Sequence, residues 1–489
     1  MNRCACDVPS HNYTWSFEPK TDWSANYATS EEIYDYFKSF SDKYGLEKFI
    51  KFRHQVIGAR WDEQEALWHV TVQDLATGNT IERTAQILIN AGGILNSWRF
   101  PPIPGINSFK GPLVHSAAWP KFGLELTGKT VGLIGNGSSG IQILPAIKDR
   151  VGKLVTFIRE GTWVAPPLGG EYKAYSKEDK ENFAADKETE AQSNSMFGIF
   201  HQGSQQQKSL QQYMNGLMKQ KLGNPQLEKV LIPKWAVGCR RLTPGTNYLE
   251  SLNDPKVQTV YGEITNITPT GVICDDGKGE YPVDVLICAT GFDTTFKPRF
   301  SVDGARGAKL QDMWKDEPQA YLGIAVDHCP NYMFTLGPNC PIGNGPVLIS
   351  IEAEVEYMIK ILSKFQKENI SAFEVRSDAV EDFNQWTATW MKDTIWAEPC
   401  RSWYKAGSAS GKILALWPGS TLHYLEALRE PRWEDWIFTR PSGSNRFQYL
   451  GNGHSTAEAN GGDLAYYIRN HDDSYIDPSL KRVHCPSLG

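Results

Sequence analysis

The stretch GKTVGLIGNGSSGIQIL, residues 128–144, decides the fold class of this chain. Val131–Ile134 predict a buried strand, and the apolar residues after the glycines predict a helix. Between these two elements lie three glycines with the spacing GxGxxG, which are Gly135, Gly137 and Gly140. In such a turn the first glycine allows the tight bend, the second lets a pyrophosphate approach the backbone, and the third packs the helix against the strand. Because a strand and a helix flank the glycines, the stretch predicts a dinucleotide-binding turn rather than a glycine turn without a nucleotide.

The rest of this turn and the end of the next strand indicate which dinucleotide is bound. The turn is completed by three polar residues that we expect beside the cofactor, namely Asn136, Ser138 and Ser139. KLVTFIR, residues 153–159, predicts the next buried strand, which ends at Arg159. An acid in that region holds the ribose of NAD, whereas an arginine accommodates the 2′-phosphate of NADP. Arg159 therefore favours NADP. NAD stays an alternative, because the acid Glu160 directly follows Arg159.

Composition and charge argue against several classes of function. The 489-residue chain has a net charge of −6 and contains no apolar run near 18 residues, so neither a nucleic acid nor a membrane is the expected partner. Its nine scattered cysteines predict reduced thiols and a cytoplasmic location. Cys4, Cys6 and His11 lie close together, but no second ligand pair follows, and no metal site is predicted. Sixteen tryptophans indicate extra core packing or a large apolar pocket, and composition leaves both open.

Helical and strand-like patterns alternate along the rest of the chain. A helix is expected over residues 26–40 with Thr29 or Ser30 as its cap, and the polar stretch from about 166 to 230 predicts further helices. Strand, turn, helix and strand in succession predict a βαβ unit with a parallel sheet, so the fold class is α/β. Further strands are predicted by four stretches with alternating or continuous apolar residues, at 49–61, 66–75, 83–93 and 284–292.

A second motif is FKGPLVHSAAWP, residues 109–120. Five of its positions match the pattern FxGxxxHxxxWP, with His115 as the histidine. A single histidine in an apolar segment is usually a packed core residue, but five matched positions just before the glycine turn are far more specific. With this pattern the sequence resembles the flavoprotein monooxygenases of the Baeyer–Villiger type, and their fungal members in particular. The resemblance implies a catalytic role for His115.

The resemblance implies two interlocked Rossmann-like domains with a helical insertion at about 166–230. Residues 1–125 are then the first segment of the FAD-binding domain, and residues 126–282 are the NADP-binding domain. Residues 283–489 supply the second FAD-binding segment and a C-terminal region for the substrate pocket. Within them SWYKAGSASGKILALWPGS, residues 402–420, is similar to a C-terminal stretch of fungal members that partly lies over the NADP side.

Two further segments carry residues that the resemblance assigns to the site. GCRRLTPGTNYLESL, residues 238–252, resembles a family segment with a basic pair. Arg241 then takes the place of the catalytic arginine beside the flavin, and Arg240 lies near the NADP phosphate. Outside the family context, a structural ion pair is the expected role of Arg241. LGPNCPIGNGPVLISIE, residues 336–352, resembles the loop and helix start that close over the flavin, and it places Val347 among the cofactor-binding residues.

The first residues, CACDVPSHNYTWSFEP at 4–19, resemble the family segment that follows an N-terminal GxGxxG unit for FAD. Asp7 then matches an aspartate over the flavin and nicotinamide rings, and Tyr13 matches a tyrosine beside the flavin. Ala5 replaces a basic residue of some members, and Cys6 belongs to the same cofactor-binding stretch. Since the sequence holds one GxGxxG turn, the FAD-binding domain is expected to be truncated at its N-terminus. Two explanations stay open, a shortened gene product and a divergent member that no longer holds FAD tightly.

The resemblance implies an enzyme, an FAD-dependent NADPH monooxygenase that inserts one oxygen atom from O2 next to a ketone carbonyl. Arg241 would stabilise negative charge on oxygen, because a guanidinium stays protonated at every relevant pH. The expected small-molecule partners are O2 and a bulky apolar ketone of secondary metabolism, and the oligomeric state is open. The alternatives are N- or S-oxygenation, and a flavin-free derivative that acts as a cyclase or lyase or has lost catalysis.

Overall fold

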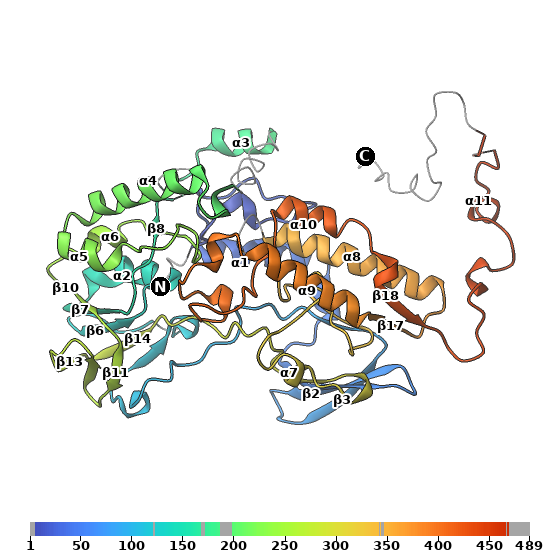
Figure 1. Cartoon of the computed structure of the whole chain (residues 1–489), viewed down its shortest axis with the longest axis horizontal. Helices are drawn as coiled ribbons and strands as arrows, with labels where there is room; N and C mark the ends of the chain where they lie inside the picture. The colour runs from blue at the N-terminus through green and yellow to red at the C-terminus, as the bar shows by residue number, and fades with distance from the viewer. Residues whose placement is uncertain are drawn as a thin grey trace.

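The glycine turn joins strand β6 of a five-stranded parallel sheet to helix α2 (Ser138–Ile147) (Figure 1). The strand order is β10-β7-β6-β14-β5, with bounds Val257–Tyr261, Lys153–Ile158, Thr130–Ile134, Val285–Cys288 and Leu113–His115. The strands β6, β7 and β14 are almost entirely buried, which explains their continuous apolar sequence. The βαβ unit predicted from this stretch is confirmed. The computed structural model describes residues 5–120, 123–167, 172–185, 198–341, 343, 347–465 and 467–468.

This sheet is built from three separate parts of the chain. Its strands β6, β7 and β10 lie within residues 126–282, whereas β5 precedes and β14 follows that range. Cys288 of β14 pairs with Ile134 on one side and with His115 on the other. The predicted α/β class with interlocked domains is confirmed, and the sheet extends past both limits proposed for the central domain.

The second half of the fold is assembled around shorter sheets. A parallel pair joins β4 (Leu88–Asn90) to β16 (Tyr332–Phe334), and a four-stranded sheet has the order β15-β1-β2-β3. The stretch 83–93, which reads as one strand, is divided between β3 and β4. The division follows from Asn331, whose side chain donates to the carbonyl of Gln86 and whose carbonyl accepts from Leu88. The four-stranded sheet consists of β1 (His54–Asp62), β2 (Leu67–Asp74), β3 (Thr80–Ala85) and β15 (Ser301–Asp303).

The helix predicted over residues 26–40 is present, but it begins at Ser30 and ends at Lys43. Helix α1 (Ser30–Lys43) is capped by Thr29, whose hydroxyl accepts from the backbone of Glu32. Residues 186–197 lie outside the described part of the predicted insertion. Its described helices are α3 (Lys177–Ala185), α4 (Gln205–Leu222) and α5 (Pro225–Leu231). In Figure 1 α4 and α5 lie at the same end of the molecule as α2.

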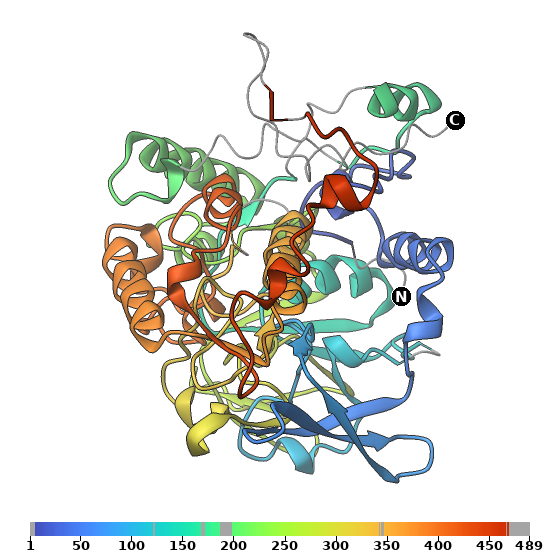
Figure 2. The same cartoon turned by 90° about the vertical axis from the view of Figure 1, so that its right-hand side faces the viewer.

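The C-terminal half packs an aromatic core between α8 (Val347–Lys367) and the sheet β17–β18. Trp417 and Trp436 are buried in this core, and Trp396 is buried in a neighbouring cluster. The tryptophan content thus serves core packing at these positions. The other elements of this half are β17 (Ala372–Val375), α9 (Ser377–Met391), α10 (Thr421–Ala427), β18 (Trp436–Thr439) and α11 (Thr456–Ala459). Figure 2 shows the helices of this half, in orange, above the blue strands of the four-stranded sheet.

The remaining short elements complete the connections. They are β8 (Val164–Ala165), β9 (Thr243–Pro244), α6 (Tyr248–Ser251), β11 (Ile264–Ile267), β12 (Gly271–Cys274), β13 (Glu280–Pro282) and α7 (Leu310–Met313). None of the described helices combines the length and the apolar composition that crossing a bilayer requires.

Candidate active site

Each of the three glycines in the turn has its own geometry. Gly135 has φ +103°, and a Cβ there would lie 2.5 Å from the carbonyl oxygen of Ala289. A Cβ on Gly140 would lie 2.1 Å from the carbonyl oxygen of Gly135, which explains how closely helix and strand pack. A Cβ on Gly137 would meet no atom within 4 Å. The open space at Gly137, next to the N-terminus of α2, fits a pyrophosphate.

The two later glycines allow a direct comparison of folding and binding. Gly140→Ala is expected to lower the thermal unfolding midpoint by several degrees, because the backbone oxygen of Gly135 has to move. Gly137→Ala, at φ −80° and with free space, is expected to leave that midpoint within about a degree. It should weaken NADP binding about tenfold, because the added methyl occupies the pyrophosphate space. Thermal unfolding and titration with NADP+ measure both effects. Equal midpoints for the two variants would contradict this assignment.

The polar residues of the turn tie it to neighbouring strands. The side-chain amide of Asn136 donates to the carbonyl oxygen of Glu160 at 2.9 Å, at the end of β7. The hydroxyls of Ser138 and Thr243 lie 2.5 Å apart, which connects α2 to β9. Ser139 is half-buried in the first turn of α2. The turn is therefore fixed before any cofactor binds.

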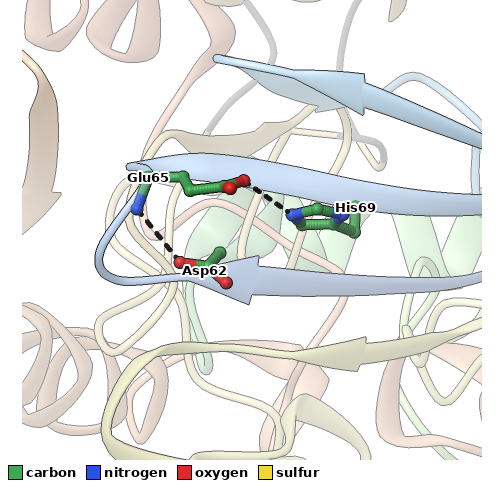
Figure 3. Close-up of side chains that lie close together, drawn as sticks. All are labelled: Asp62, Glu65 and His69. Atoms are coloured by element: carbon green, nitrogen blue, oxygen red, sulfur yellow. Dashed lines mark hydrogen bonds and ion pairs between the residues drawn. The ribbon is translucent and has the colours of Figure 1, made fainter.

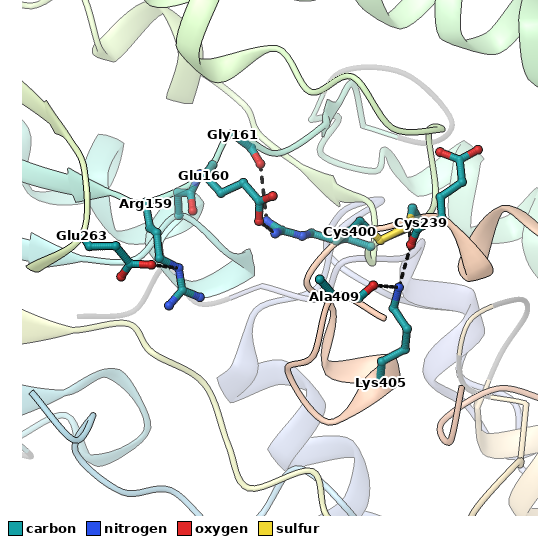
Figure 4. A network of polar contacts seen from close by, with 11 residues as sticks. Arg159, Glu160, Gly161, Cys239, Glu263, Cys400, Lys405 and Ala409 are labelled. Atoms are coloured by element: carbon teal, nitrogen blue, oxygen red, sulfur yellow. Dashed lines mark hydrogen bonds and ion pairs between the residues drawn. A yellow bond between two sulfur atoms is a disulfide. The ribbon is translucent and has the colours of Figure 1, made fainter. Parts of the chain in front are cut away.

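The charged residues after β7 separate into two ion pairs (Figure 4). Glu160 pairs with Arg240, and the guanidinium of Arg240 also lies 4.7 Å from the ring centre of Trp235. Arg159 is half-exposed and lies 3.6 Å from Glu263. Burial, together with the positive charges of Arg159 and Arg401, lowers the pKa of Arg240 to about 10. Because Arg240 engages the Glu160 carboxylate, this acid is less available to a ribose hydroxyl, which favours the NADP interpretation.

Asp7 and Arg241 form a two-point ion pair although they lie 234 residues apart in sequence. Nε of Arg241 donates to Oδ2 of Asp7 at 2.9 Å, and a terminal guanidinium nitrogen donates to Oδ1 at 3.1 Å. Burial opposes the charge on Arg241, but the negative charge of Asp7 and the neighbouring Tyr404 raise its pKa above the ordinary value. Burial also raises the pKa of the Tyr404 hydroxyl to about 12. The guanidinium is thus held in one orientation and stays charged.

The N-terminal segment lies between the glycine turn and α8. The backbone of Ala5 donates to the side chain of Gln142 in α2 at 3.2 Å, and that of Cys6 donates to Ala28 at 3.1 Å. Burial raises the pKa of the Cys6 thiol to about 11, so the thiol stays protonated. Tyr13 ends a short 3-10 helix that contacts α8, whose first residue is Val347. The segment therefore contacts both α2, which follows the glycine turn, and the helix that begins at Val347.

His115 lies apart from this ion pair in the contacts that the structure describes. Its ring stacks on Trp98 at 4.7 Å between centroids, and it is 1% exposed at the end of β5. The backbone of Ala117 donates to Nδ1 at 3.1 Å, so Nε2 carries the proton and faces Thr290 at 3.4 Å. Burial lowers the pKa of the ring. This neutral histidine holds the chain returning from β4 against the end of β14.

Two features of the site were missed by the sequence analysis. Cys239 and Cys400 form a disulfide, so the prediction of reduced thiols is wrong for this pair (Figure 4). Its partners lie 161 residues apart, and nothing in the spacing of nine cysteines indicates which of them pair. Tyr404 beside Arg241 is the second. The SWYKAG stretch gave a signal for this region, but the contact with Arg241 depends on how the C-terminal chain folds back.

A group of ligand-type side chains lies elsewhere, on the hairpin between β1 and β2 (Figure 3). Polar atoms of Asp62, Glu65 and His69 lie within 4.8 Å of one another. One Asp62 oxygen already accepts backbone N–H groups of Gln64 and Glu65, as a hairpin turn requires. The group therefore has a structural explanation, and the absence of a metal stays a prediction. Of the earlier Cys4, Cys6 and His11 cluster, Cys4 lies outside the described residues.

Comparisons with known proteins show the family to which the chain belongs. The model of the flavin-binding monooxygenase-like family matches residues 10–173. The chain is 35% identical to the FAD-binding monooxygenase moxY of Dothistroma septosporum, over 94% of this chain and 76% of that protein. It is 30% identical to a Baeyer–Villiger monooxygenase of Streptomyces coelicolor, over 90% and 84% of the two chains. The crystal structure of a Rhodococcus cyclohexanone monooxygenase bound to NADP+ superposes with a TM-score of 0.78 at 26% identity, covering 90% and 91% of the chains. The chain therefore belongs to the flavin-binding monooxygenase-like family.

Proposed function

We propose that this monooxygenase inserts one oxygen atom of O2 next to the carbonyl of a bulky apolar ketone, using FAD and NADPH. The observation that carries the proposal is the two-point pair of Asp7 and Arg241. The pair and the neighbouring Tyr404 come from three parts of the chain. Asp7 belongs to the N-terminal segment, Arg241 to the central domain and Tyr404 to the C-terminal region. A fixed, permanently charged guanidinium at such a junction is suited to stabilising an oxygen anion.

NADP binds on the central domain in this proposal. The pyrophosphate lies over Gly137 at the N-terminus of α2, where backbone N–H groups and the helix dipole favour negative charge. The 2′-phosphate lies near Arg159 and Arg240, beyond the end of β7. The domain limits 1–125, 126–282 and 283–489 remain part of this proposal.

The N-terminal segment and the start of α8 would hold the flavin in this proposal. Ala5, Cys6, Asp7 and Tyr13 would contribute from the segment, and the backbone at Val347 would contribute from the first turn of α8. The bound flavin supplies the activation of O2 by electrons from NADPH. Arg241 then stabilises negative charge on the reacting oxygen, and Asp7 keeps the guanidinium oriented toward it. His115 acts as a positioning residue, because its contacts hold the chain between the two domains.

The ketone and the secondary-metabolite role rest on the kinds of relatives that match. One relative of 30% identity is named a Baeyer–Villiger monooxygenase. Fungal FAD-binding monooxygenases match at 35–36% identity, among them stcW of Emericella nidulans over 94% of this chain and 79% of that protein. These names support the oxygenation class, and the match to fungal proteins supports a bulky substrate of secondary metabolism.

The test is an oxygen-transfer assay with the FAD-reconstituted protein. We expect NADPH oxidation and incorporation of one atom from ¹⁸O2 into an ester or lactone when bulky cyclic ketones are supplied. Thioethers and tertiary amines of similar size serve as parallel substrates, and sulfoxide or N-oxide without any ester would favour the N- or S-oxygenation alternative. No NADPH turnover at saturating FAD, with product formed in the absence of flavin, would favour the cyclase or lyase alternative.

A further inference from the structure

A third arginine, Arg401, lies near Arg240, one of the two arginines that are predicted to bind the NADP phosphate. Arg401 belongs to the C-terminal region, far from Arg159 and Arg240 in sequence, and its side chain is exposed. The positive charges of Arg159 and Arg401 both act on Arg240, where they add to the effect of burial in lowering its pKa. The structure thus gathers like charges from three chain segments, an arrangement that costs free energy unless an anion binds there.

The disulfide explains why Arg401 lies near this place. Cys239 immediately precedes Arg240, and Cys400 immediately precedes Arg401. The two bridged Cα atoms lie 6.4 Å apart. Since neighbouring Cα atoms are 3.8 Å apart, the bridge keeps those of the two arginines within about 14 Å. A guanidinium extends several ångströms beyond its Cα, so both side chains can reach one phosphate.

Hydrogen bonds fix the loop that carries Arg401 against the central domain. A Glu398 carboxylate oxygen accepts from the backbone of Ala236 at 2.7 Å. The ammonium of Lys405, which is 2% exposed, donates to the carbonyl oxygens of Glu398 at 2.7 Å and Ala409 at 2.8 Å (Figure 4). The disulfide and these bonds together leave Arg401 little freedom to move away from Arg240.

The local charges leave a positive excess. Arg240 is paired with Glu160 and Arg159 with Glu263. Among the described residues, no carboxylate forms an ion pair with Arg401. The Nε–H of Arg240 is buried and has no hydrogen-bond partner in the described part of the chain. An anion placed here would therefore find an unpaired guanidinium and an unused donor. A phosphate monoester has the charge and the number of acceptors to use both.

We propose that Arg401, held beside Arg240 by the Cys239–Cys400 disulfide, is a further specificity residue for the 2′-phosphate of NADP. The inference rests on NADP use in the proposed function. It makes the preference for NADP over NAD depend on the disulfide, because the reduced loop can carry Arg401 away from the phosphate. The C-terminal region then has a part in choosing the nucleotide.

Binding of the isolated nucleotide fragments tests this without flavin, oxygen or ketone. Adenosine 2′,5′-bisphosphate and 5′-AMP differ by the 2′-phosphate, and each is titrated calorimetrically into the oxidised protein. For Arg401→Gln we expect about tenfold weaker binding of the bisphosphate and unchanged binding of 5′-AMP. Arg446→Gln, which removes the same charge from another exposed site, is expected to change neither affinity. Equal bisphosphate affinities for these two variants, or an equal loss for both ligands, would overturn the role of Arg401.

The disulfide is tested by reduction and by substitution. Cys400→Ser and reduction of the wild-type protein are each expected to weaken bisphosphate binding, though by no more than Arg401→Gln does, because the hydrogen bonds of Glu398 and Lys405 still hold part of the loop. In the Arg401→Gln background, reduction should cause no further loss, because both changes remove one interaction. Thermal unfolding confirms that each variant is folded, and reduction tests the bridge if Cys400→Ser does not fold. A further loss in that background would refute the positioning role. Wild-type protein that binds no bisphosphate would overturn the NADP site of the proposed function as well.

Discussion

Arg241→Ala is expected to lower the rate of ester formation by a factor of about 10² to 10³ in the FAD-reconstituted enzyme. The alanine variant loses the charge that stabilises the reacting oxygen, and removal of one such donor costs about 3–4 kcal/mol in the barrier. It also leaves Asp7 without its two hydrogen-bond donors. NADP+ affinity should stay within about twofold, because the glycine turn and Arg159 do not depend on Arg241 for their contacts. Product formation and NADP+ titration measure the two effects separately.

Two further variants show whether charge or orientation is needed. Arg241→Lys keeps a positive charge but loses the planar two-point contact, and we expect it to remain at least tenfold slower than wild type. Asp7→Asn keeps the size of the side chain and removes the charge that orients the guanidinium. Its loss and that of Arg241→Ala should be less than additive in the double variant, because the pair acts as a unit. Ester formation by Arg241→Ala within threefold of wild type would show that the pair is structural.

The fold could be predicted where a local sequence pattern is enough to determine a helix, a strand or a turn. The glycine turn, β6, β7 and the cap of α1 are of this kind, since spacing and apolar runs decide them. The split of 83–93 into β3 and β4 could not be predicted in this way. It depends on Asn331, which lies more than 200 residues later and pairs with the backbone only after the chain has folded.

The candidate site shows the same division between local and distant information. Residues such as Arg159 follow a motif closely enough for the sequence alone to suggest a role. The contacts of Arg241 with Asp7 and Tyr404, and the bond between Cys239 and Cys400, join segments more than 150 residues apart. A single sequence has no signal for such pairs, and the family resemblance supplied the role of Arg241 without supplying its partners.

A buried acid on α8 leads to the second large effect, a dependence of stability on pH. Glu354 is fully buried, and one carboxyl oxygen accepts the backbone N–H of Leu336 at 3.0 Å. The hydroxyl of Tyr424 lies 2.9 Å from the other oxygen and 2.9 Å from the carbonyl oxygen of Leu322. A tyrosine has one proton to donate, and the carbonyl can only accept it. Both contacts are satisfied together when Glu354 is protonated and donates to Tyr424. Burial accordingly raises the pKa of Glu354 to about 8.

Glu354→Gln is therefore expected to stabilise the protein at high pH and to leave it nearly unchanged at low pH. The ordinary pKa of 4.5 lies below the folded value of about 8, so the folded state binds more protons between these limits. The free energy of unfolding of the wild type falls by about 1.4 kcal/mol per pH unit as pH rises through this window, and by roughly 5 kcal/mol in total. Glutamine stays neutral, accepts from Leu336 and donates to Tyr424, so its variant avoids this loss.

We expect thermal midpoints equal within about 2 °C at pH 5 and a higher midpoint for Glu354→Gln, by several degrees, at pH 9. Glu356→Gln, an exposed position on the same helix, should follow the wild type at both pH values. A constant difference between Glu354→Gln and wild type from pH 5 to pH 9 would show that the carboxyl of the folded protein is ionised like that of the unfolded chain, which would contradict the raised pKa of Glu354.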